Sequence, residues 1–185
     1  MVMFLIQPNC PGCILHGLPV ANAVASSKNL FDIYCVSTAF EDFEHNKVEN
    51  TMDLLQGKLH GASAAKLGPE TETIPTMPVA YDVVVPREEA SDELRLTSLE
   101  ALKENAREQL QAMGVPEKRI ELALAHVEPD ALPEKIAEIF WGVRAQGTPT
   151  WVVHRADGEI LGVEFGFMDE TKLRSWVNEL IGEAV

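Results

Sequence analysis

Basic residues are scarce in this sequence. Its 185 residues include 15 Lys and Arg against 29 Asp and Glu, which gives a formal net charge of −14 at pH 7. Such a charge repels nucleic-acid backbones and anionic lipid surfaces, so we expect neither a nucleic-acid partner nor a membrane partner. Long apolar runs are also missing. The apolar runs that do occur, such as Val2–Ile6, fall far short of the roughly 20 residues that a membrane-spanning helix needs.

Cysteine is equally scarce, with three residues in the chain. Three thiols can form too few disulfide bonds to stabilise a chain of this size, which excludes a small disulfide-rich secreted scaffold. No Lys or Arg precedes Lys28, so the first residues lack the charged start of a secretory signal peptide. These absences lead us to expect a cytoplasmic protein. The length predicts a single domain, 1–185.

The first 40 residues predict a strand, a helix and a second strand. Val2–Ile6 is continuously apolar, as in a strand that is buried on both faces. From Ile14 the apolar positions recur at helical spacing, which predicts a helix that is kinked at Pro19 and ends near residues 28–29. Leu30–Ser37 is rich in β-branched and aromatic residues and is expected to form the second strand.

The middle of the chain is expected to be mostly helical. We predict a polar helix from about His45 to Gln56, a loop over Gly57–Thr73 and a short extended segment over Met77–Val85. Residues 97–141 look wholly helical because apolar positions recur at steps of three and four. We treat the part of about 86–138 as an all-helical insertion, whose acidic face we read as a solvated surface rather than a docking surface.

The last 40 residues return to β-structure. Thr150–His154 and Ile160–Phe165 read as two strands joined by a tight turn at Asp157-Gly158, a dipeptide that favours hairpins. Asp169 can then cap a final helix. The expected order therefore places a β-hairpin and a helix after the insertion.

Cys10-Pro11-Gly12-Cys13 lies where the first strand passes into the first helix. The free N–H groups and the macrodipole of a helix amino terminus favour the thiolate of the first cysteine, so its pKa should be lowered. Cys13 lies one turn further along and can attack a mixed disulfide on Cys10, which releases the partner. We therefore assign Cys10 as the attacking thiol and Cys13 as the resolving thiol, with Pro11 and Gly12 tuning the environment of the sulfur.

Metal binding is the alternative use of these residues. Cys10, Cys13 and His16 could supply three ligands, but structural zinc usually takes four, and no second paired motif occurs elsewhere. Cys35 falls within a predicted strand and reads as a buried core thiol. We therefore expect no metal and no cofactor.

Two features together resemble the thioredoxin superfamily. One is the cysteine pair after a buried strand, and the other is Thr148-Pro149 before a later strand that is followed by a hairpin and a terminal helix. The resemblance implies a thioredoxin-like three-layer α/β/α fold with a mixed central sheet. It also implies that Pro149 is a catalytic cis-proline facing the cysteines, and that the Thr148 backbone pairs with an extended substrate segment. Trp151 would begin the strand beside this site. As a tryptophan it is typical of the core, but because it lies next to the site we include it with Pro11, Gly12 and Thr148 as a predicted substrate-binding residue.

Four segments are similar to the TlpA/ResA-like and peroxiredoxin-like branch of that superfamily: Phe140–Arg144, Gly147–Val153, Asp157-Gly158 and Met77–Asp82. Two positions depart from the pattern. Phe4 stands where many thioredoxins carry a buried acid. Gln7 stands where peroxidase chemistry in that branch needs Thr or Ser, so we do not expect a dedicated peroxidase.

Together these residues predict a thiol–disulfide oxidoreductase. It would act on a disulfide-containing protein or a small-thiol substrate, with a thiol as electron donor, and in a reducing cytosol the net direction would be reduction. Two alternatives stay open. One is a peroxide- or glutathione-linked enzyme on the same fold, and the other is a redox-inactive binding or adaptor module that uses the insertion. No pattern in the sequence indicates an oligomeric state.

Overall fold

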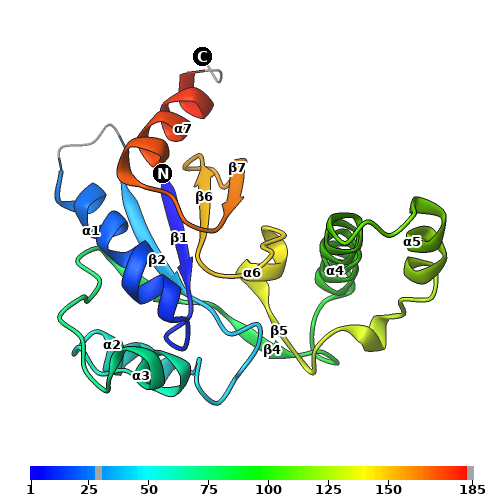
Figure 1. Ribbon diagram of the computed structural model, residues 1–185, viewed down its shortest axis with the longest axis horizontal. Coiled ribbons are helices and arrows are strands. Elements are labelled where there is room, and N and C mark those ends of the chain that lie inside the picture. Colours follow the sequence, from blue (N-terminus) through cyan, green and yellow to red (C-terminus); the bar gives the residue numbers. More distant parts are fainter. Residues whose placement is uncertain (28–30, 183–185) are drawn as a thin grey trace. The chain divides into compact units, whose positions relative to one another are not determined.

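A computed structural model describes residues 1–27 and 31–182 (Figure 1). The chain divides into two compact units. The first consists of Met1–Asp82 together with Gly147–Val185, and the second of Val83–Gln146. The second unit contains the helices that the sequence predicts between about 86 and 138. No helix in the described part of the chain is long and apolar enough to cross a membrane.

The first unit is built on a mixed sheet of five strands in the order β3-β2-β1-β6-β7. These strands are β1 (Val2–Ile6), β2 (Ile33–Ser37), β3 (Val79–Tyr81), β6 (Thr150–His154) and β7 (Ile160–Phe165). The central strand, β1, pairs in parallel with β2 and antiparallel with β6. Every residue of β1 is buried, which is why its sequence is a continuous apolar run rather than an alternation. The mixed α/β class and the mixed central sheet are confirmed.

One apolar core lies between the sheet and two helices, α1 (Leu18–Ser26) and α7 (Glu170–Gly182), which contact each other. Its members include Phe4, Leu18, Trp151 and Leu173. The hairpin and the last helix form as expected. Gly158 adopts a φ of +94°, which glycine tolerates without a steric cost, and the Asp169 carboxylate accepts the Lys172 N–H at 2.7 Å.

Two expectations for residues 45–73 are wrong. The predicted loop contains a helix, α3 (Gly61–Leu67), and the polar helix is the shorter α2 (Val48–Leu54). The buried face of α2 is mixed: Leu54 is 1% exposed and belongs to the core, and Thr51 is buried with its hydroxyl bonded to the Ser37 hydroxyl at 2.7 Å, whereas Met52 is 53% exposed. Burial on α2 therefore does not follow apolarity alone. The predicted helix end at 28–29 and the first residue of the second predicted strand lie outside the described residues.

The second unit combines helices with a two-stranded ribbon. Its elements are β4 (Val84–Pro86), α4 (Asp92–Ala112), α5 (Glu117–Leu124), the 3₁₀ turn η2 (Pro129–Ala131), β5 (Lys135–Ala137) and α6 (Glu138–Gly142). The insertion is thus not all-helical, and residues 97–141 are not wholly helical, because Ile136 and Ala137 are buried in a strand paired with β4. The partner strand lies about 50 residues earlier in the chain, and local periodicity cannot reveal such a pairing.

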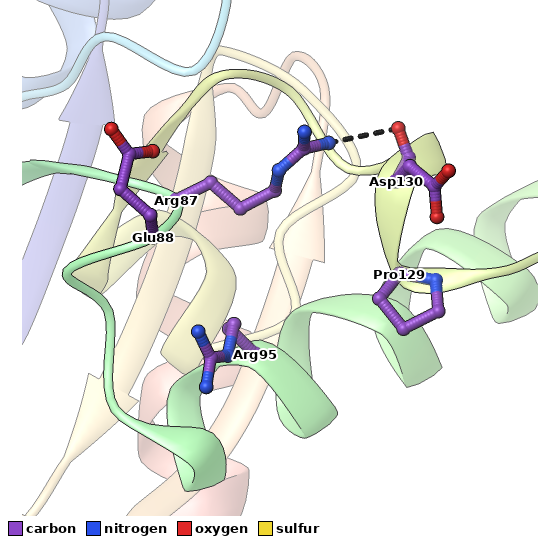
Figure 2. Close-up of a pocket in the computed structure, with 5 residues that line it drawn as sticks. All are labelled: Arg87, Glu88, Arg95, Pro129 and Asp130. Carbon is purple, nitrogen blue, oxygen red and sulfur yellow. Dashed lines mark hydrogen bonds between the residues drawn. The ribbon is translucent and has the colours of Figure 1, made fainter.

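An open hollow of about 590 Å³ lies on the second unit (Figure 2). Its lining is formed by Arg87, Glu88, Arg95, Pro129 and Asp130. The Arg87 guanidinium donates to the main-chain oxygens of Asp130 at 2.8 Å and Leu132 at 2.7 Å, so it ties the end of β4 to η2. Arg95 is paired with Asp92 on its own helix. Both guanidinium groups thus have protein partners, and the hollow belongs to the scaffold of this unit.

Candidate functional site

Cys10 lies at the amino terminus of the first helical segment. Its N–H donates to the Gln7 main-chain oxygen at 3.0 Å, which closes a turn after β1, and its own carbonyl accepts the Ile14 N–H at 3.3 Å. Pro11 and Gly12 begin the helix, a π-helical turn η1 (Cys13–Gly17) follows, and α1 continues from it. Proline suits this first turn because an N–H there would have no helical partner. Pro19 follows the π-helical turn within this continuous helical run and does not end it.

The sulfur of Cys10 is surrounded by groups that favour its anion. Its Sγ accepts the Cys13 N–H at 3.1 Å. The pKa of Cys10 falls from its ordinary 9.0 to about 6, chiefly because the Cys13 thiol donates a hydrogen bond to it. Burial opposes this change, while the Cys13 and Gly12 main chain and the Thr148 side chain lower the pKa further. Cys10 is therefore mainly a thiolate at neutral pH, the form that attacks disulfides.

Cys13 has the opposite character. It has no exposed surface, and burial raises its pKa well above the ordinary value, as do its hydrogen bond with Cys10 and the charge on that sulfur. A buried thiol that keeps its proton can donate to the neighbouring thiolate. The two sulfurs thus differ in access and in protonation, as an attacking and a resolving cysteine must.

The Thr148-Pro149 segment lies against this pair. The peptide bond between the two residues is cis, and the Thr148 carbonyl oxygen lies 3.5 Å from Cys10 Sγ. Pro149 is buried beside the helix: a Cβ on Gly17 would lie 3.5 Å from Pro149 Cβ and 2.5 Å from Phe4 Cζ. The structure therefore brings together Cys10, Cys13, Thr148 and Pro149, although 138 residues separate Cys10 from Thr148.

Trp151 does not join the substrate-facing residues, so its predicted binding role is corrected. Its side chain has no exposed surface, its indole N–H donates to the Gly166 carbonyl at 3.1 Å, and its ring stacks on Phe4 with centroids 4.2 Å apart. Trp151 and Phe4 are opposite each other in the register of β6 and β1. Strand alternation turns both rings into the core.

Sequence reasoning missed the aromatic neighbour of the motif. Phe167 follows β7, is 60% exposed, and lies so close to Gly12 that a Cβ there would be 2.8 Å from its ring. Its ring also meets the edge of His16 with centroids 5.0 Å apart. A hollow of about 370 Å³ is lined by Leu15, His16, Val20, Phe167, Met168 and Asp169. Apolar surface thus lies next to the thiolate, but no motif near Phe167 signals this position.

Sequence reasoning also gave Asn9 no role. Its side chain is 9% exposed; Nδ2 donates to Asp42 Oδ2 at 2.9 Å, and Oδ1 accepts the Ala62 N–H at 2.5 Å. The Asn9 N–H donates to Asn46 Oδ1 at 3.0 Å. These bonds hold the residue before Cys10 between α3 and the 42–46 segment, so the redox turn starts from a fixed position.

The third cysteine stands apart from this site. Cys35 is fully buried in β2, and burial raises its pKa, which makes its thiol unreactive. All three cysteines are free. Within residues 1–27 and 31–182, no group of three or more His, Cys, Asp or Glu side chains is arranged to hold a metal ion.

Two solved structures are similar to this chain. One is a thiol-disulfide isomerase from Corynebacterium glutamicum, with 18% identity, a TM-score of 0.51, and coverage of 97% of this chain and 78% of that one. The other is described as a thioredoxin-like superfamily protein, with 17% identity, a TM-score of 0.52, and coverage of 100% and 80%. No known family model and no curated protein matches the sequence. The sheet order and these two likenesses together show that the chain has a thioredoxin-like fold.

Proposed function

We propose that this protein is a thiol–disulfide oxidoreductase whose redox centre is the Cys10–Cys13 pair. The observation that carries the proposal is the asymmetry of the two sulfurs. Cys10 is accessible, accepts the Cys13 N–H at 3.1 Å and has a pKa of about 6, whereas Cys13 is buried and keeps its proton. Structural thiols are usually inert and alike, so this difference favours catalysis.

The reaction proceeds in two exchanges. The Cys10 thiolate attacks one sulfur of a substrate disulfide, a Cys10–substrate disulfide forms, and the other substrate sulfur leaves as a thiolate that takes a proton. Cys13 then loses its proton and attacks Cys10 Sγ, which breaks the mixed disulfide and releases the second substrate thiol. The substrate gains two electrons, and the protein retains a Cys10–Cys13 disulfide. A thiol electron donor returns the pair to its dithiol state by the reverse exchanges.

The cis-proline loop is the proposed substrate contact. Thr148 lies beside Cys10, and its main chain can pair with an extended segment that carries the target cysteine. Pro11 and Gly12, the two half-buried residues between the cysteines, complete the proposed contact. We include a cytosolic location in the proposal; the net direction there is reduction, because the glutathione pool keeps thiols reduced.

Insulin reduction with a dithiol donor tests the proposal. The wild-type protein should accelerate the reaction, Cys10→Ser should abolish the acceleration, and Cys13→Ser should accumulate mixed disulfides that mass spectrometry detects. A variant with Cys35→Ala is the matched control and should behave as wild type, because that thiol is buried away from solvent. Full activity of Cys10→Ser would overturn the proposal. A parallel assay with glutathione disulfide distinguishes protein substrates from small-thiol substrates.

A further inference from the structure

Gln7 is a buried polar side chain beside the redox pair. It follows β1 directly, stands three residues before Cys10, and is 3% exposed. Its main-chain oxygen accepts the Cys10 N–H at 3.0 Å. Its side chain bonds in two directions: Nε2 donates to the Glu41 main-chain oxygen at 3.4 Å, and Oε1 accepts the Thr148 hydroxyl at 3.2 Å. Gln7 therefore joins the turn that carries Cys10 to the cis-proline loop.

The Thr148 residue presents two different groups to this region. Its carbonyl oxygen lies 3.5 Å from Cys10 Sγ and can accept a hydrogen bond only while Cys10 is a thiol. A thiolate has no proton to donate and instead needs donors. The Thr148 hydroxyl is such a donor, and contact with this side chain lowers the pKa of both Cys10 and Cys13.

One hydroxyl carries one proton and donates it to one acceptor at a time. In this structure the Thr148 hydroxyl lies 3.2 Å from Gln7 Oε1, and the same side chain also lowers the pKa of Cys10, so the hydroxyl is within reach of both acceptors. Two acceptors, an amide oxygen and a sulfur anion, thus compete for the same donor. The titratable groups that meet this pair within the described residues are Cys10 and Cys13, and Glu41 reaches Gln7 only through its main chain.

We propose that Gln7 is a positioning residue that holds the Thr148 hydroxyl and so limits its donation to the Cys10 sulfur. This inference rests on the proposed redox function and deepens it. While Cys10 is a thiol or is joined to Cys13, the hydroxyl stays on Gln7 and the loop keeps its place. When the Cys10 thiolate forms, donation to sulfur requires the Gln7 bond to break. Gln7 thereby restrains how far the reduced state is stabilised.

Removing the competing acceptor tests this idea, because it should lower the Cys10 pKa, and a general disturbance of the site does not predict a change in that direction. Gln7→Met keeps the length of the side chain but has no amide oxygen, so the Thr148 hydroxyl is released to the sulfur. We expect the Cys10 pKa to fall by about half a unit to one unit, which is about a three- to tenfold change in the thiolate-to-thiol ratio. Thr148→Val removes the donor and should raise the Cys10 pKa. Gln7→Met combined with Thr148→Val should match Thr148→Val alone.

The measurement is the pH dependence of the iodoacetamide rate at Cys10, in a Cys35→Ala background. A second readout is the equilibrium in which the Cys10–Cys13 disulfide and two glutathiones give the dithiol and glutathione disulfide. Gln7→Met should shift it toward the dithiol by a similar factor. Gln56→Met, at an exposed glutamine that accepts from Lys58, is the matched control and should change neither value. Gln7→Leu serves as a second variant if Gln7→Met unfolds.

The outcomes separate the two proposals. A fall in the Cys10 pKa that disappears in the Thr148→Val background supports the role of Gln7. An unchanged or raised pKa in Gln7→Met and Gln7→Leu overturns it, as does a fall that persists without the Thr148 hydroxyl. If wild-type Cys10 instead shows an ordinary pKa and exchanges no disulfide, the redox function itself fails.

Discussion

Replacing Cys13 probes how Cys10 becomes a thiolate. With a pKa of about 6, roughly 90% of Cys10 is ionised at pH 7, against about 1% at the ordinary 9.0. The largest cause of this shift is the hydrogen bond from the Cys13 thiol, and the Cys13 N–H at 3.1 Å adds to it. Cys13→Ala removes the first bond and keeps the second. Cys13→Ser keeps a donor at the same place.

The magnitude follows from the strength of a bond to a charged acceptor. Such a bond contributes about 1.5–3 kcal/mol, or about one to two pKa units. Cys10 is partly exposed, and water weakens the effect, so we take the lower end. Cys13→Ala should then raise the Cys10 pKa by about one unit, which lowers its alkylation rate at pH 6 about fivefold. Cys13→Ser should change that rate much less.

The assay is pseudo-first-order alkylation by iodoacetamide between pH 4 and pH 9, with mass spectrometry to identify the labelled residue. Cys35→Ala is present in every protein, so the two Cys13 variants have a single thiol. In the wild type, Cys10 should react first because Cys13 is buried. A wild-type midpoint near pH 9 would refute the reasoning. Equal shifts of the Cys10 pKa in Cys13→Ala and Cys13→Ser would show that the hydrogen bond from the Cys13 side chain is not the cause. The helix amino terminus would then be the remaining explanation.

Four further predictions concern stability. Because the pKa of Cys10 is lower in the folded than in the unfolded state, the thiolate stabilises the fold fully above about pH 9, and this stabilisation is lost as the pH falls through 6. In urea unfolding at pH 7, the free energy of unfolding of the reduced wild type should therefore exceed that of Cys10→Ala by about 1 kcal/mol from this cause. Cys35→Ser should cost about 1–3 kcal/mol more than Cys35→Ala in the same assay, because its hydroxyl is buried. Gly17→Ala should destabilise by about 1–3 kcal/mol, since its Cβ would lie 2.5 Å from the Phe4 ring in the core. Trp151→Ala should cost about 3–5 kcal/mol in thermal or urea unfolding, whereas Trp151→Phe should keep the Cys10 alkylation rate; a selective loss of substrate affinity would contradict its core role.

Local sequence patterns predicted most of the elements around the sheet. The apolar run of β1, the Asp157-Gly158 turn and the Asp169 cap each depend on neighbouring residues, so a short window contains their cause. The patterns failed where burial had another origin. Thr51 on the buried face of α2 is held by its hydrogen bond to Ser37, and β5 exists because β4 pairs with it from a distant part of the chain.

The sequence by itself determined the chemistry that this site offers. Two thiols separated by two residues at a strand-to-helix junction place a sulfur at a helix amino terminus, and that spacing defines an attacking and a resolving position. Only the tertiary structure decided what surrounds the sulfurs. Burial makes Cys13 keep its proton, the distant Thr148 meets Cys10, and Trp151 turns into the core. The reason is physical: a pKa depends on desolvation and on donors supplied by residues far apart in the chain, and these come together only when the sheet forms.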